Sequence, residues 1–169
     1  MPFSLIPDLI LPAVTALTPE MLRARGVCFL MLDFDNTIVP YTTSVPTEEM
    51  TRWLRAMQTS EIRLCVVSNS RKPRVLEFCR QYGLDCITHA KKPFQRGIRE
   101  CLARFSLYPT ECALAGDQIY TDVLGANCAG MTSVLVSAIH NHTIWLKLRH
   151  VAELPFIAIG RRKINHEKH

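Results

Sequence analysis

Two carboxylates separated by one residue, Asp33 and Asp35, follow an apolar run at residues 27–32. Such a run indicates a buried strand. Side chains at positions i and i+2 of an extended segment point the same way, so both carboxylates are expected to face one site. An aspartate can attack phosphorus as a nucleophile, and a second carboxyl can protonate the leaving oxygen and then activate water. A helix cap or turn remains the alternative for this pair.

Two further clusters could bind a phosphoryl group. Ser68 and Asn69 follow a second apolar run, where the hydroxyl could donate to a phosphoryl oxygen or cap the next helix. Lys91 and Lys92 precede Pro93 just before a predicted helix. A fixed lysine can neutralise charge on a transferring phosphoryl group, although a pair of solvated surface lysines is the alternative.

A last cluster offers oxygen ligands. Gly116 and Asp117 end another apolar run, and Asp122 follows five residues later. Carboxylates of this kind suit Mg²⁺, which takes one or two protein carboxylates together with water and a phosphate oxygen. In the alternative interpretation, Asp122 only caps the following helix.

The elements that must position these clusters alternate along the chain. Apolar runs predict strands at residues 27–32, 62–67, 85–88, 112–115 and 132–136. Amphipathic stretches predict helices that begin near residue 46 and that cover residues 73–82, 94–105 and 122–129. Gly83 is expected to be a left-handed cap of the second helix. This alternation predicts an α/β fold with a mainly parallel sheet, whose ligands lie beyond the carboxyl ends of the strands.

Composition narrows the class of protein. The chain has 169 residues, 48% hydrophobic and 21% charged, with a formal net charge of +5, which is typical of one globular domain. No uninterrupted apolar stretch is long enough to predict a spanning helix, and the apolar opening lacks the basic start of a signal peptide. The charge favours anionic partners without choosing among phosphate esters, lipid and nucleic acid.

Cysteine usage predicts the redox compartment. The seven cysteines are odd in number and form no C-x-x-C pair, so a disulfide framework or a thiolate metal site is not expected. Cys28, Cys65 and Cys112 fall in apolar runs and are predicted to be reduced core residues of a cytosolic protein.

The ordered set D-x-D-N-T, S-N, K-P and G-D-x-x-x-T-D resembles the four-motif signature of the haloacid dehalogenase-like (HAD) phosphohydrolases. The resemblance implies a three-layer α/β/α Rossmann-like fold, with Asp33 as nucleophile and Asp35 as general acid/base. Phosphate binding would fall to Ser68, Asn69, Lys92 and Asn36, with Lys91 in reserve. Mg²⁺ would be held by Asp33, Asp117 and the main-chain carbonyl of Asp35. Supporting roles would fall to Asp122, beside the metal or Lys92, and to Thr37.

Nearly the whole chain is similar to the bacterial YqeG family of subfamily IIIA HAD phosphatases. The similarity includes residues 17–22, 32–37, 67–69, 90–93, 116–118 and 121–127. This family is related to mitochondrial phosphatidylglycerophosphate phosphatases, which implies a precursor of phosphatidylglycerol as substrate.

We expect one domain over residues 1–169, with a core at 25–140, an apolar segment at 1–24 and a basic amphipathic tail at 141–169. Thirty-two residues separate Asp35 from Ser68 and twenty-three separate Ser68 from Lys92. Each gap holds one predicted helix, so no large cap domain is expected. An open site suits a large substrate, such as a lipid headgroup or a polymer end. Alternatively, a neighbouring subunit closes the site.

The sequence therefore predicts a Mg²⁺-dependent phosphomonoesterase that forms an aspartyl phosphate, with phosphatidylglycerophosphate as the preferred substrate. The alternatives are a phosphatase for a soluble sugar or nucleotide phosphate or a nucleic-acid 3′-phosphate, and a non-catalytic HAD-fold binding protein. Nucleic acid is disfavoured because it needs a basic aromatic groove beside the nucleophile. We expect a cytoplasmic protein whose terminal segments either contact the inner face of the membrane or pack on the core or a second subunit.

Overall fold

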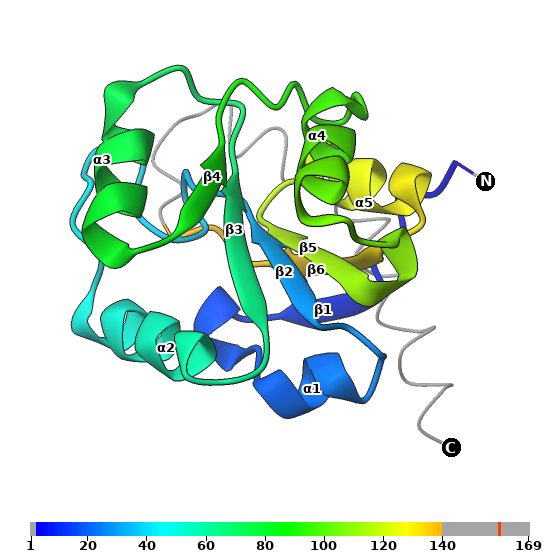
Figure 1. Cartoon of the computed structure of the whole chain (residues 1–169), viewed down its shortest axis with the longest axis horizontal. Helices are drawn as coiled ribbons and strands as arrows, with labels where there is room; N and C mark the ends of the chain where they lie inside the picture. Colours follow the sequence, from blue (N-terminus) through cyan, green and yellow to red (C-terminus); the bar gives the residue numbers. More distant parts are fainter. Residues whose placement is uncertain (1–2, 140–158, 160–169) are drawn as a thin grey trace.

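The computed structural model describes residues 3–139 and residue 159 (Figure 1). Its six strands are all paired in parallel, in the order β1-β6-β5-β2-β3-β4. The strands are Leu9–Leu11 (β1), Phe29–Leu32 (β2), Arg63–Val67 (β3), Asp85–Ile87 (β4), Cys112–Gly116 (β5) and Thr132–Val136 (β6). The α-helices are Pro19–Arg23 (α1), Glu48–Gln58 (α2), Pro73–Tyr82 (α3), Arg96–Phe105 (α4) and Leu124–Ala129 (α5). Shorter turns are the 3-10 segments Val14–Ala16 and Pro109–Glu111 and the π-helical turn Ile119–Val123.

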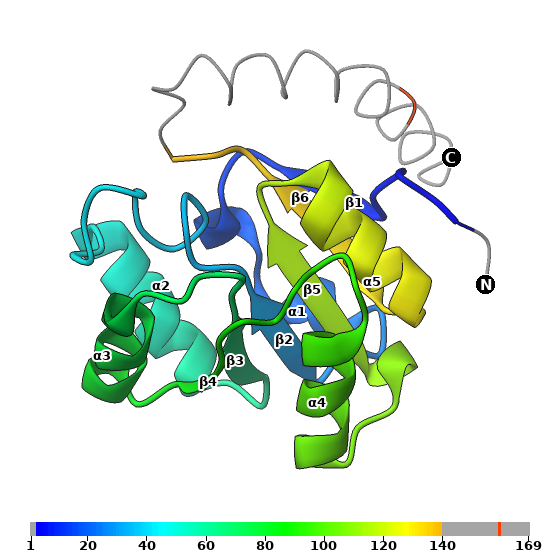
Figure 2. The ribbon, with the colours of Figure 1, turned by 90° about the horizontal axis from the view of Figure 1, so that it is seen from above.

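The sheet separates two apolar cores, because successive side chains of a strand point to opposite faces. Leu30 and Leu32 of β2 pack in one core with side chains from α1, α2 and α3. Phe29 and Met31 pack in the other core with side chains from α4 and α5. Figure 2 shows α2 and α3 on one side of the strands and α4 and α5 on the other. The predicted three-layer α/β/α fold is therefore confirmed.

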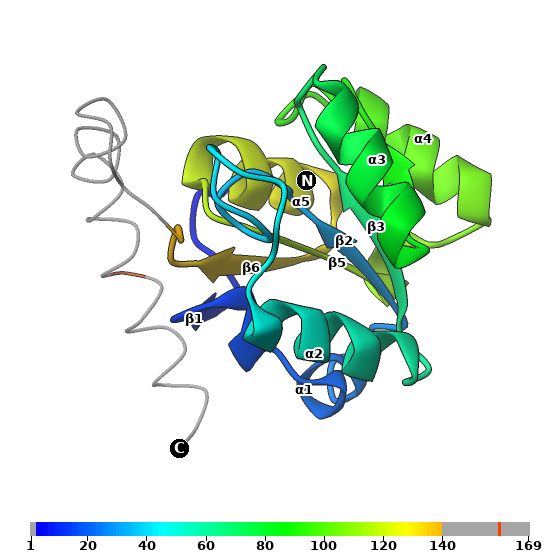
Figure 3. The same ribbon diagram turned by 90° about the vertical axis from the view of Figure 1, so that its left-hand side faces the viewer.

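The N-terminal segment is built into this core. Leu9 of β1 is paired with Val134 of β6 at the sheet edge (Figure 3). Leu17 and Leu22 are fully buried, and the Trp53 indole N–H donates to the main-chain oxygen of Leu17 over 2.7 Å. Neither β1 nor α1 was predicted, since a three-residue strand shows no periodicity of its own. Leu9, Val14, Leu17 and Leu22 of this segment thus pack on the core, whereas Phe3 is exposed.

The helix boundaries agree with the sequence-based predictions in one case and differ from them in two. The helix predicted at residues 73–82 is confirmed as α3, and Gly83 ends it with a φ of 63°, as expected for a left-handed cap. The helix predicted from residue 94 begins at Arg96 instead. The segment predicted as one helix at 122–129 is divided into the π-helical turn and α5, so Asp122 lies inside the turn.

The structure tests the predicted burial of three cysteines. All seven are free thiols, and Cys65 and Cys112 are buried. Cys28 is exposed, and the prediction that it belongs to the core was wrong. Cys28 lies just before β2, which begins at Phe29.

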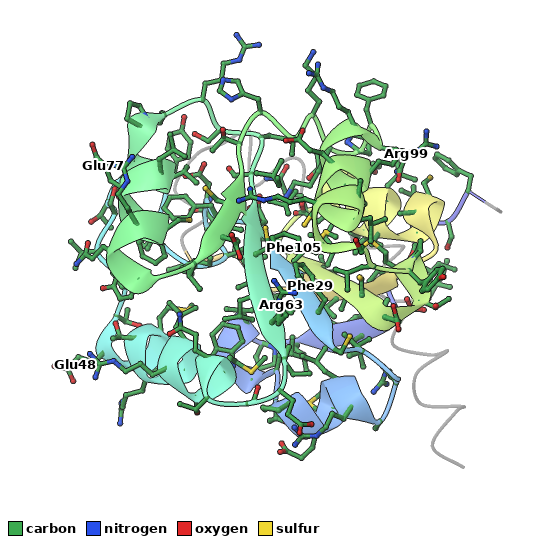
Figure 4. All side chains as sticks on the ribbon, viewed as in Figure 1. Phe29, Glu48, Arg63, Glu77, Arg99 and Phe105 are labelled. Atoms are coloured by element: carbon green, nitrogen blue, oxygen red, sulfur yellow. The ribbon has the colours of Figure 1, made fainter. Side chains whose placement is uncertain are left out.

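The amino end of the sheet is covered by an aromatic pair and a cation. The ring centroids of Phe29 and Phe105 are 5.0 Å apart, and the Arg63 guanidinium lies over them at 5.8 and 4.9 Å (Figure 4). Such stacking satisfies a cation on a ring face while the alkyl stem covers apolar surface. The polar clusters found in the sequence lie at the opposite, carboxyl end of the strands.

Within the described part of the chain, no helix is long and apolar enough to cross a membrane. The connections after β2 and β3 each hold a single helix, α2 and α3. Apart from residue 159, the predicted basic tail at 141–169 lies outside the described residues.

Candidate active site

Four polar side chains from separate strand ends meet at one edge of the sheet. Asp33 follows β2, Ser68 follows β3 and Asp117 follows β5, and these three strands are neighbours. Lys92 reaches the same edge from the connection between β4 and α4. Parallel neighbours end at the same edge, which is where open α/β sheets bind ligands. All four side chains are buried.

Lys92 links two carboxylates. Its Nζ lies 2.8 Å from Asp33 Oδ1 and 2.7 Å from Asp122 Oδ1. A buried ammonium is costly unless it is paired, so both contacts stabilise its position. Lys91, the reserve lysine, is exposed. The structure therefore brings Lys92, and not Lys91, next to the predicted nucleophile.

Asn69 holds the main chain of this lysine. Its amide nitrogen donates to the Lys92 carbonyl over 2.9 Å, and its amide oxygen accepts from the Lys92 N–H over 2.7 Å. Both polar ends of the Asn69 side chain are thus engaged by one peptide segment. In this structure Asn69 positions the lysine, whereas the sequence analysis predicted direct phosphate binding.

Burial and pairing shape the titration of the two central groups. Burial raises the pKa of Asp33 to about 6, against the opposing effect of the Lys92 ammonium. Burial lowers the pKa of Lys92, but the carboxylates of Asp122 and Asp33 more than offset this, and the pKa lies above its ordinary value. Lys92 is therefore a permanent cation. A further positive charge beside Asp33 would favour its ionised form.

Asp33, Asp117 and Asp122 form a cluster that fits a divalent cation. One carboxylate oxygen from each lies within 4.8 Å of the others. When ionised, three carboxylates facing the single Lys92 ammonium leave two negative charges in excess, which matches the charge of a divalent ion. Asp33 Oδ2 is also buried without a hydrogen-bond partner among the described residues. The metal ligands predicted from the sequence are Asp33, Asp117 and the Asp35 carbonyl, and the structure also brings Asp122 close to the Asp33 and Asp117 carboxylates.

Asp122 is held by the turn in which it lies. Its Oδ2 accepts from the Gln118 N–H over 3.1 Å, while Oδ1 faces Lys92. A Cβ atom at Gly116 would overlap the Asp122 carboxyl group. The glycine at the end of β5 is therefore required by the close approach of this side chain.

Asp35 has a partner that the sequence analysis missed. Its carboxylate forms an ion pair with Arg74, in the first turn of α3. The Arg74 Nη1 also donates to the Thr43 carbonyl over 2.5 Å. A signal was present in the cations at Arg71, Lys72 and Arg74, which directly follow the strand end that bears Ser68.

The remaining predicted residues have separate environments. Asn36 adopts a φ of 62° and accepts from the Tyr41 N–H over 3.2 Å, so its amide oxygen shapes the loop after Asp35. Thr37 is buried, and its hydroxyl has no hydrogen-bond partner in the described structure. The Ser68 hydroxyl oxygen accepts from the Ser70 N–H over 3.0 Å, which leaves its proton for donation to another group.

Comparison with known proteins identifies the family. A HAD-hydrolase-like family model matches residues 89–144. A Bacillus subtilis (strain 168) protein named "Probable phosphatase YqeG" is 32% identical over 131 residues, which are 78% of this chain and 76% of that protein. The chain belongs to the YqeG family of HAD-like phosphatases. The predicted family and enzyme class are thereby confirmed.

Solved structures support the fold of this YqeG-family phosphatase. The cobalt-bound deoxy-D-mannose-octulosonate 8-phosphate phosphatase of Haemophilus influenzae has a TM-score of 0.54 at 12% identity, covering 74% of this chain and 75% of that one. The 3-deoxy-D-manno-octulosonate 8-phosphate phosphatase of Yersinia pestis has a TM-score of 0.53 at 14% identity, covering 88% and 90%. At these identities the likeness concerns the fold alone.

The contact between Gly116 and Asp122 predicts that Gly116→Ala displaces the Asp122 carboxylate from Lys92. We expect the free energy of unfolding, measured in urea, to fall by about 1–3 kcal/mol, as in overpacked cores. Phosphatase activity is expected to fall at least about tenfold, because Lys92 loses one of two charged partners.

Gly125→Ala is the matched control. An added Cβ there meets the end of the Ile98 side chain at 3.3 Å, where a flexible methyl group can move aside. Gly125 also lies in α5, where alanine is the better helix former. Equal losses of activity in the two variants would contradict the role given to the Gly116–Asp122 contact.

Proposed function

We propose that this phosphatase hydrolyses phosphomonoesters through an aspartyl phosphate on Asp33, with Asp35 as general acid and base. The buried contact between Lys92 and Asp33 carries the proposal, because it fixes a carboxylate against a permanent cation at the carboxyl ends of the strands. Such an arrangement suits a nucleophile that must attack an anionic phosphoryl group.

The proposed reaction has two steps. A carboxylate oxygen of Asp33 forms a bond to phosphorus while the bond from phosphorus to the ester oxygen breaks. The Asp35 carboxyl protonates the leaving alkoxide and then takes a proton from water, which attacks phosphorus and releases inorganic phosphate and free Asp33. The Lys92 ammonium and the Ser68 hydroxyl oppose the charge on the phosphoryl oxygens, where most catalysis of phosphoryl transfer is found.

The metal assigned to this site is Mg²⁺. Asp33 and Asp117 would hold it with the Asp35 main-chain carbonyl, and Asp122 would support the site through Lys92. Ligands that are all oxygen are those that Mg²⁺ prefers. When bound, the ion would supply positive charge that offsets the charge of the phosphoryl oxygens.

The proposed substrate is phosphatidylglycerophosphate, presented as an anionic headgroup at a membrane surface. The single helices after β2 and β3 support this assignment, because neither connection holds a cap domain over the site. Enzymes for small metabolites often close a lid to exclude water. Peripheral contact with the inner face of the membrane belongs to the same proposal.

Asp33→Asn tests the nucleophile. An amide oxygen is a poor nucleophile, so we expect kcat on p-nitrophenyl phosphate to fall by at least about 10³-fold, as when other covalent catalysts lose the attacking group. The circular dichroism spectrum should be unchanged. Asp85→Asn is the matched control and should retain activity. It removes a carboxylate of β4 that pairs with exposed Arg104 over 3.4 Å. Activity in Asp33→Asn equal to that of the control would refute the assignment.

Removal of divalent metal with EDTA is expected to abolish turnover, and excess Mg²⁺ is expected to restore it. In the same experiment Mg²⁺ should raise the melting temperature of the wild type, because an ion that binds only the folded state stabilises it. Asp117→Asn should weaken that thermal shift, since it removes one of the clustered carboxylates. Full activity in EDTA would contradict a metal-dependent reaction.

Vesicles that carry phosphatidylglycerophosphate test the substrate. We expect kcat/KM to be higher on these vesicles than on soluble sugar phosphates, nucleotides or a 3′-phosphorylated oligonucleotide, with released phosphate as the readout. A higher kcat/KM on any soluble ester would refute the lipid substrate and leave the phosphomonoesterase activity standing.

A further inference from the structure

We propose that Arg74, Lys72 and the ring of Tyr41 form a second anion-binding subsite, which recognises an anionic group on the leaving part of the substrate. The inference rests on the proposed function, in which the phosphoryl group lies at Asp33 and the leaving oxygen at Asp35. The subsite therefore selects phosphomonoesters that carry a second negative group beyond the ester bond.

Arg74 is held in place by several neighbours. Its guanidinium lies over the rings of Phe34 and Tyr41, at 5.2 and 5.6 Å from their centroids. Its Nη1 donates to the carbonyls of Thr43 and Pro40 over 2.5 and 3.5 Å. The Nη2 group points to Asp35. Apart from the ion pair with Asp35, the buried Nε and Nη2 atoms have no hydrogen-bond partner in the described structure, so these donors are left for a planar or tetrahedral anion.

Positive charge exceeds negative charge around Tyr41. The Lys72 ammonium lies 3.9 Å from the centroid of the same ring that Arg74 covers. Asp35 is paired with Arg74, but Lys72 has no ion pair with a carboxylate among the described residues. Two cations thus lie over one ring, and only Arg74 is paired with a carboxylate. The opposite imbalance exists around Asp33, where carboxylates exceed cations and suit a divalent cation, so an anionic group of the substrate is better placed beside Arg74 and Lys72.

The ion pair of Asp35 conflicts with its proposed chemistry. A general acid must face the leaving oxygen, whereas the Asp35 carboxylate in this structure is paired with Arg74. An anion of the substrate that binds Arg74 would replace Asp35 there and free its carboxyl group to face the leaving oxygen. The exchange also avoids leaving the partly buried guanidinium without a partner.

The location limits the spacing of the two substrate groups. A leaving oxygen hydrogen-bonded to Asp35 lies within two successive hydrogen bonds of Arg74, or about 6 Å. A short polyol can bridge such a distance. Both a phosphodiester and a second phosphomonoester supply the required charge, and the two sources can be tested separately.

The experiment compares kcat/KM on sn-glycerol 3-phosphate with kcat/KM on two related compounds, glycerol 1,3-bisphosphate and glycerophosphoglycerol phosphate. The second compound carries a phosphodiester. We expect the wild type in Mg²⁺ to prefer at least one of them over glycerol 3-phosphate by roughly 10- to 100-fold, the range of one hydrogen bond to a charged group. The compound with the larger preference identifies the source of the anion.

Arg74→Ala is expected to reduce that preference by roughly 10- to 100-fold. Arg74→Lys should retain an intermediate preference, because it keeps the charge and loses the planar fork. Lys72→Gln is a second variant at an exposed residue, where folding is not at risk, and should reduce the preference by a smaller factor. Arg80→Ala removes the same charge from an exposed position further along α3 and should leave the preference unchanged.

An equal loss on all three substrates in Arg74→Ala, with the wild-type preference retained, would overturn the subsite and leave Arg74 as a residue that only positions Asp35. An absent preference in the wild type would also overturn it. If the wild type hydrolysed none of the three esters nor p-nitrophenyl phosphate, the proposed function would fail, which is distinguishable from the loss of preference alone.

Discussion

The buried ammonium of Lys92 is the charge on which the arrangement of this site depends. A cation removed from water must be surrounded by anions, and Asp33 and Asp122 supply them at 2.8 and 2.7 Å. These carboxylates come from segments far apart in the chain, so the lysine connects the end of β2 to the turn after β5. Asn69 connects the end of β3 to the same lysine, because its side-chain amide forms two hydrogen bonds with the main chain of Lys92. The need to pair the Lys92 ammonium thus brings together the chain segments that follow β2, β3 and β5.

The sheet makes this pairing geometrically feasible. β2 lies between β5 and β3, so the chain segments that follow all three strands emerge side by side at the same edge. Gly116 ends β5 without a side chain, which leaves the space that the Asp122 carboxyl group occupies. The apolar packing on both faces of the sheet holds the strand ends in register. The polar residues therefore do not have to assemble the site by themselves.

Charge is divided unevenly across the site. Around Asp33, carboxylates outnumber the single ammonium, which suits a divalent cation. Around Tyr41, Arg74 and Lys72 outnumber the single carboxylate of Asp35. Asp35 lies at the boundary, where it contacts the cationic half and follows the nucleophile by two residues. The proposed acid and base is thus the group that links the reacting centre to the rest of the substrate.

The sequence by itself determined the features that depend on neighbours in the chain. Apolar periodicity located five of the six strands, Gly83 marked the end of α3, and the order of the motifs identified the HAD-like phosphatase family. Only the tertiary structure decided the pairing of β1 with β6, the ion pair between Asp35 and Arg74 and the use of Asn69 to hold Lys92. The physical reason is distance along the chain. Asp33 and Lys92 are separated by 59 positions, and their buried contact exists only because folding brings the end of β2 and the connection after β4 together.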